Sequence, residues 1–228
     1  AISFLYYSDR LLEFPLGLFG IAIATVILPT LSHNHVSKDD KAFSANIVWA
    51  VKMVCLLGIP AATGLFLLAE PMLLTIFQRG EFTPEHARYA SHSLMAYSFG
   101  LLSFMLIKVL APGFYSKQDI KTPVKFGIWC MAANMLFNLI LVWPFDYVGL
   151  AMATSLSALM NVFLLYVTLH RRGVYTASSR TIILILKVVF ASILMGTVIF
   201  MFNPLATAWV NFPLLDKILE LTKLITLG

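Results

Sequence analysis

Charged side chains are scarce in this sequence, because Asp, Glu, Lys and Arg together make up only 12% of its 228 residues. Soluble domains carry about 25%. Hydrophobic residues make up 60% of the chain and the mean hydropathy is +0.87, which is more apolar surface than a soluble core can bury. These residues fall in runs of about 20, the length that crosses a hydrocarbon layer of about 30 Å. The composition excludes an ordinary soluble protein and predicts an all-α, polytopic transmembrane helix bundle.

The motifs of common enzyme classes are also missing. The sequence contains no nucleotide-binding glycine loop, no nucleophile elbow and no zinc-binding helix motif. His86 and His92 have spacings that match no metal motif, so we expect no metal site and no cofactor. The two cysteines, Cys55 and Cys130, lie inside apolar runs and are expected to be unpaired core residues. A transporter is favoured over an enzyme.

Six apolar segments are long enough to cross the bilayer, and a seventh stretch at 212–227 carries charges. We interpret the seventh as an interfacial helix or a partial span. Between the second and third spans, the apolar residues Leu73, Leu74, Ile76 and Phe77 are expected at the membrane surface. A helix is expected to start at Thr83 or Pro84. The four-residue gap after the fourth span predicts antiparallel neighbours. The six spans are 2–31, 47–69, 89–111, 126–143, 148–169 and 181–202.

Basic residues gather in alternate connectors and form no stripe typical of nucleic-acid binding, despite the net charge of +5. Connectors 32–46, 112–125 and 170–180 hold eight Lys and Arg residues, whereas 70–88, 144–147 and 203–217 hold three. The positive-inside rule places the first set in the cytoplasm and the chain start outside. Because such a start requires earlier spans, we expect an N-terminal portion of the protein to be absent from this sequence.

Three ionisable residues, Asp9, Arg10 and Glu13, lie within the first span. Arg10 would lie about 12 Å along the helix at ~1.5 Å per residue, where charges are costly unless they face protein or water. One interpretation is an anion site, because a guanidinium suits phosphate or carboxylate. The other is the aqueous end of a helix. Pro15, one turn later, favours a bend beside the cluster.

Other polar residues in the spans have simpler explanations. Lys52 and Lys108 lie near the cytoplasmic ends of their spans, from where a long side chain can reach the interface. Asn134 and Asn138 are one turn apart in the fourth span, and they are expected to hydrogen-bond between helices.

Three segments resemble one family of membrane proteins. These are YYSDRLLEFPLG at 6–17, LPTLS at 28–32 and KVLAPGFYSKQDIKTPVK at 108–125. They are similar to the MurJ (MviN) lipid II flippases of the multidrug/oligosaccharidyl-lipid/polysaccharide (MOP) exporter superfamily, which also contains the MATE exporters. The resemblance implies the C-lobe of a two-lobed transporter, with family helices 8–12 in residues 1–170 and helix 13 with the start of helix 14 in residues 171–228.

The resemblance also implies a function. Family members move lipid II from the cytoplasmic to the periplasmic leaflet of the bacterial inner membrane by alternating access, in peptidoglycan biosynthesis. Arg10 matches a cavity arginine that holds the lipid pyrophosphate, Asp9 and Glu13 lie beside it, and Ser3 matches a cavity-facing position. The implied partners are lipid II, membrane lipids and the missing N-terminal lobe, without which transport is not expected.

Other functions remain open from the sequence. A MATE-type exporter of cationic drugs would call for cavity acids without a partner arginine, and the adjacent Asp9 and Arg10 argue against it. Another polysaccharide-lipid flippase is a further alternative. A membrane scaffold or an enzyme of lipid-linked sugars is a third class, and the enzyme would need clustered acids in cytoplasmic connectors. Asp39, Asp40 and Asp119 lie among lysines there and are expected to be solvated.

Overall fold

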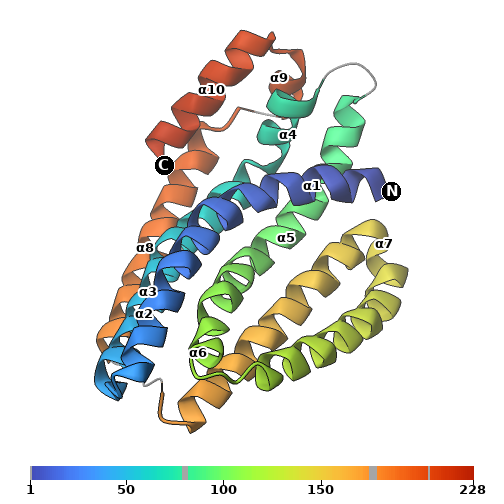
Figure 1. Cartoon of the computed structure of the whole chain (residues 1–228). Coiled ribbons are helices and arrows are strands. Elements are labelled where there is room, and N and C mark those ends of the chain that lie inside the picture. Colours follow the sequence, from blue (N-terminus) through green and yellow to red (C-terminus); the bar gives the residue numbers. More distant parts are fainter. Residues whose placement is uncertain (1, 79–81, 175–178, 205) are drawn as a thin grey trace.

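The computed structural model describes residues 2–78, 82–174, 179–204 and 206–228, and within these ranges the chain is helical without strands (Figure 1). One helical segment is a π-helix, labelled η1. The elements in chain order are α1 (Ile2–Pro15), η1 (Leu16–Ile21), α2 (Ala22–Val36), α3 (Asp40–Leu67), α4 (Ala69–Phe77), α5 (Pro84–Leu110), α6 (Pro112–Tyr115), α7 (Lys121–Arg171), α8 (Ser179–Phe202), α9 (Ala206–Asn211) and α10 (Leu214–Leu227).

Among the described residues, five helices are long and apolar enough to cross a membrane, and one of them contains two predicted spans. Helix α7 runs over 51 residues, but Asp146 interrupts it with non-helical angles of φ 50° and ψ −131°. Figure 1 shows α7 as a hairpin whose two arms lie side by side. The fourth and fifth predicted spans are these antiparallel arms, so the helical membrane-protein fold is confirmed.

The tip of the α7 hairpin requires a glycine. A Cβ atom at Gly149 would lie 2.3 Å from the carbonyl oxygen of Leu141, so no larger residue fits without moving the backbone. Further from the tip, Asn134 donates a hydrogen bond to Ser157 of the other arm at 3.4 Å, and Asn138 donates to Asn134 at 3.0 Å. The predicted bonding of these amides between spans is confirmed for Asn134.

The helices pack in a sequence that separates α7 from α8. Helix α8 packs on α3, α3 packs on α5, and α5 packs on α7. Figure 1 accordingly shows the α7 hairpin on one side of the bundle and α8 on the other. Cys55 and Cys130 are buried and unpaired, as predicted.

The connectors differ from the sequence-based expectation. The loop predicted at 32–46 shrinks to 37–39, because α2 continues to Val36 and the Asp39 carboxylate caps α3 by accepting from the Ala42 N–H at 2.9 Å. Of the four apolar residues expected at the membrane surface, Ile76 is exposed, whereas Leu73 and Leu74 lie on the protein-facing side of α4. Both are buried, because α4 follows α3 after a single residue and folds against α5. Thr83 caps α5 and Pro84 begins it, as predicted.

The C-terminal helix α10 is packed against the helical bundle. It packs against α4 and α8, with Leu224 and Lys217 buried. The Lys217 ammonium donates a hydrogen bond to the side-chain oxygen of Gln78. Burial lowers the pKa of Lys217. The charged stretch at 212–227 is therefore a short helix attached to the bundle, and the basic residue in its first turn has a structural partner.

Candidate functional site

Helix α1 has one face buried in the bundle and one face open. The Ser8 hydroxyl is fully buried and donates a hydrogen bond to the Ala90 carbonyl of α5 at 2.7 Å. Leu11 and Leu12 are buried on the same side. This contact fixes the rotation of α1 about its axis, and Arg10, two residues after Ser8, therefore lies on the side of α1 away from α5.

The open face carries the Arg10 cluster, which consists of Tyr6, Asp9, Arg10 and Glu13. The Arg10 guanidinium donates to the Glu13 carboxylate at 3.1 Å and to the Tyr6 hydroxyl at 3.0 Å. It also lies 4.9 Å from the centre of the Tyr6 ring, within cation–π range. The side chains of Arg10 and Glu13 are 55% and 54% exposed. The guanidinium is thus oriented by its own helix and remains accessible.

The chain bends directly after this cluster. Pro15 has no N–H to donate to the carbonyl one turn earlier, and the next six residues form the π-helical segment η1. Figure 1 shows the blue helix changing direction between α1 and α2. Such π-helical turns are frequent at functional sites. The bend beside the charged residues that Pro15 predicted is therefore present.

The structure brings together some of the predicted site residues. Arg10 and Glu13 form an ion pair, whereas Asp9 is exposed and makes no ion pair or hydrogen bond with the described residues. The side chain of Ser3 lies outside the described part of the chain. Tyr6 was missed, although its spacing of four residues from Arg10 is the signal for a contact on one helical face.

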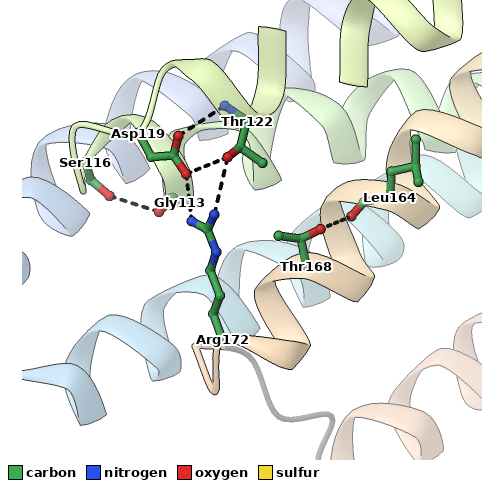
Figure 2. A network of polar contacts seen from close by, with 7 residues as sticks. All are labelled: Gly113, Ser116, Asp119, Thr122, Leu164, Thr168 and Arg172. Atoms are coloured by element: carbon green, nitrogen blue, oxygen red, sulfur yellow. Dashed lines mark hydrogen bonds and ion pairs between the residues drawn. The ribbon is translucent and has the colours of Figure 1, made fainter. Parts of the chain in front are cut away.

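A second arginine site joins the two ends of the α7 hairpin (Figure 2). We call Asp119, Thr122 and Arg172 the Asp119 clamp. The Asp119 carboxylate accepts from the Thr122 hydroxyl at 2.7 Å, from the Thr122 N–H at 3.1 Å and from the Arg172 guanidinium at 2.7 Å. Arg172 also donates to the Thr122 hydroxyl at 3.3 Å and lies 5.4 Å from the centre of the Phe114 ring.

The clamp overturns the expectation that Asp119 is solvated. Hydrogen bonds from Thr122, and then from Arg172, hold the pKa of the Asp119 carboxyl below its usual value. The neighbouring Lys117 ammonium lies 4.8 Å from the centre of the Phe43 ring on α3. The connector between α6 and α7 therefore contacts both the end of α7 and α3, and these contacts fix its position.

These features define a class of protein. A helical bundle of membrane-spanning length, with an accessible guanidinium on a bent helix, is typical of a multi-pass membrane transporter. The chain belongs to the MurJ family, because the family model described as lipid II flippase MurJ matches residues 1–219.

Relatives support the assignment along the whole chain. The probable lipid II flippase MurJ of Vibrio cholerae is 54% identical over 100% of this chain and 43% of its own length. That of Haemophilus influenzae is 51% identical over 100% of this chain and 46% of its own length. The chain thus spans less than half the length of these relatives.

A solved structure supports the fold. It is described as lipid II flippase MurJ, inward closed conformation, and it superposes with a TM-score of 0.81 at 24% identity. The match covers 99% of this chain and 45% of that chain. This match confirms the fold, and the family model and the relatives confirm the resemblance to the MurJ family seen in the sequence.

Proposed function

We propose that this chain is the C-lobe of a lipid II flippase, which moves lipid II from the cytoplasmic to the periplasmic leaflet of the bacterial inner membrane by alternating access. Membership of the MurJ family and the names of its relatives support this function. Because the chain spans 43% to 46% of those relatives, transport requires the remaining lobe of such a protein. The charge bias of the connectors supports a chain start on the periplasmic side.

One observation carries the proposal: Arg10 is exposed, and its partners Tyr6 and Glu13 lie on its own helix. Glu13 occupies one N–H of the guanidinium fork and Tyr6 another, and a guanidinium offers five such donors. A diphosphate can bind the remaining donors in the two-pronged geometry that arginine favours. Asp9 and Ser3 would line the same cavity, where Asp9 limits the net positive charge.

The division at residue 170 belongs to the same proposal. Residues 1–170 would form the C-lobe proper, and residues 171–228 would add helices beside it. Helix α8 supports this division, because it packs on α3 and exposes large apolar side chains such as Leu186, Phe190 and Leu194 to the surroundings. Such a surface suits contact with lipid tails.

Replacement of Arg10 in the full-length protein tests the function. Arg10→Ala should abolish complementation of a flippase-depleted strain at normal protein levels, because the diphosphate loses its guanidinium ligand. Arg171→Ala removes an exposed arginine at the end of α7 and should support normal growth. Normal growth of the Arg10→Ala strain would contradict the assigned role. Increased drug tolerance on overexpression would instead favour a multidrug exporter.

A further inference from the structure

Three aromatic rings pack together beside the Arg10 cluster, where α1 meets the end of α4 and the residues just before α5. The centre of the Tyr7 ring of α1 lies 4.9 Å from that of Phe77 and 4.8 Å from that of Phe82. The two phenylalanine rings are 6.1 Å apart. We call Tyr7, Phe77 and Phe82 the aromatic trio. Tilted and edge-to-face contacts at these distances are favourable, so the trio holds α1 against two other parts of the chain.

The two phenylalanines lie at helix ends that are themselves held in place. Phe77 is the last residue of α4, and the side chain of the residue after it accepts a hydrogen bond from Lys217 of α10. Phe82 directly precedes Thr83, the residue that caps α5. Figure 1 shows α4 and the start of α5 at the same end of the bundle. All three rings of the trio are partly buried against the core, which gives Tyr7 a fixed position.

Tyr7 also contacts Tyr6, the tyrosine of the Arg10 cluster. The two rings meet edge to face, with their centres 5.9 Å apart. Tyr6 is 55% exposed, and an exposed side chain on a helix has more than one rotamer open to it. The fixed ring of Tyr7 occupies one side of Tyr6 and favours the rotamer in which the Tyr6 ring lies under the Arg10 guanidinium.

The Arg10 guanidinium is held in two directions by Tyr6 and Glu13. It donates to the Tyr6 hydroxyl at 3.0 Å and to the Glu13 carboxylate at 3.1 Å, and it lies 4.9 Å from the centre of the Tyr6 ring. Together these contacts set the plane of the guanidinium. Two-pronged binding of a phosphate depends on that plane. A guanidinium that is already oriented loses less conformational entropy when the ligand binds.

We propose that Tyr6 and Tyr7 are positioning residues for the diphosphate of lipid II, a role that rests on the function proposed for Arg10. Tyr7 is held by the aromatic trio and selects the rotamer of Tyr6. Tyr6 then holds the Arg10 guanidinium in the plane in which it meets the diphosphate. The ends of α4 and α5 therefore influence ligand affinity without contacting the ligand.

Lipid II binding to the purified full-length protein in detergent, measured by microscale thermophoresis, tests the proposal. Tyr6→Leu should weaken binding about tenfold, because it removes the hydroxyl acceptor and the ring under the guanidinium. Tyr7→Leu should weaken binding about threefold, because only part of the population then has the guanidinium correctly oriented. Tyr7→Phe keeps the ring and should restore the affinity of the wild type.

Tyr89 of α5 provides a matched control, because it makes the same two kinds of contact without belonging to the Arg10 cluster. Its hydroxyl donates to the Glu85 carboxylate at 3.0 Å, and its ring centre lies 5.9 Å from that of Tyr147. Tyr89→Leu should therefore leave the affinity for lipid II unchanged. An equal loss of affinity in Tyr89→Leu and Tyr6→Leu would identify a general packing effect and overturn the proposal.

Replacement of Arg10 separates this proposal from the proposed function. Arg10→Ala should weaken lipid II binding more than either tyrosine variant, and Tyr6→Leu should add nothing in that background, because Tyr6 acts through Arg10. If Arg10→Ala weakens binding but Tyr6→Leu does not, the positioning role is overturned and the function of Arg10 stands. If Arg10→Ala binds as tightly as the wild type, both fail. Since Tyr6 is exposed, Tyr6→Leu should melt like the wild type, and its affinity decides the question even if Tyr7→Leu unfolds.

Discussion

The two arginine sites use the same chemistry for opposite purposes. Arg10 and Arg172 each bind a carboxylate, a hydroxyl group and an aromatic ring. The Arg10 partners are three and four residues away on one helix, whereas the hydrogen-bonding partners of Arg172 are 50 and 53 residues away. The partners of Arg10 orient its side chain, whereas the partners of Arg172 hold together segments that are distant in the sequence.

This difference separates function from stability. Local contacts form whenever α1 is helical, and within the described residues the hydrogen bonds of Arg10 go only to its own helix. The Asp119 clamp joins the start of α7 to the residue after its end, and Gly149 closes the same hairpin at its tip. A guanidinium whose partners all lie on its own helix can also bind a ligand. A guanidinium that joins distant segments uses its donors to stabilise the fold.

The largest expected effect comes from the tip of the hairpin. Gly149→Ala would place a Cβ atom 2.3 Å from the Leu141 oxygen, so the backbone at the tip of the hairpin must shift. We expect a loss of about 3 kcal/mol or more in the free energy of unfolding, as in severe overpacking. Purification yield and melting temperature measure it.

A glycine in the same helix provides the control. A Cβ atom added at Gly127 would have no heavy atom within 4 Å apart from its chain neighbours and the surrounding backbone of its own helix, so Gly127→Ala should leave the stability unchanged or slightly higher. A Gly149→Ala protein that melts like the wild type would show that the hairpin tip tolerates a side chain.

The next effect tests the comparison between the two arginines directly. Arg172→Ala should lower the free energy of unfolding by about 1 kcal/mol, because the ion pair with Asp119 is partly exposed. Arg10→Ala should leave it nearly unchanged, although it abolishes complementation. Melting temperatures of the two purified variants measure the contrast. Equal destabilisation by both variants would remove the distinction between a ligand-binding arginine and a structural one.

Sequence reasoning identified Asp9, Arg10 and Glu13 because they are neighbours on one helix, although it missed Tyr6. Spacing along a helix is visible in a sequence, and so are the spans and the helix start at Pro84. The same reasoning missed the Asp119 clamp, because the interval between Asp119 and Arg172 becomes a contact only after α7 folds back on itself. The burial of Leu73 and Leu74 was not predicted for a similar reason, since a short apolar segment does not reveal whether protein or lipid will cover it.

The smallest effect is a pH dependence confined to the Asp119 clamp. Because Thr122 and Arg172 lower the pKa of Asp119 in the folded state, its stabilising contribution is present above the unfolded value of about 3.9 and is lost as the pH falls through the lower folded value. The stability difference between the wild type and Asp119→Asn should therefore be constant from about pH 7 to about pH 5 and shrink below about pH 4. Melting curves in detergent measure this difference.

Thr122→Val sharpens the pH test, because the Thr122 hydroxyl is the strongest of the interactions that lower the Asp119 pKa. Without this donor the folded pKa moves back toward the unfolded value, so the ionised carboxylate contributes less stability and loses that contribution at a higher pH. Arg172 remains in the variant and should preserve part of the effect. If the Thr122→Val and wild-type proteins lost stability at the same pH, the guanidinium alone would set the charge state of Asp119, and the clamp would reduce to a simple ion pair.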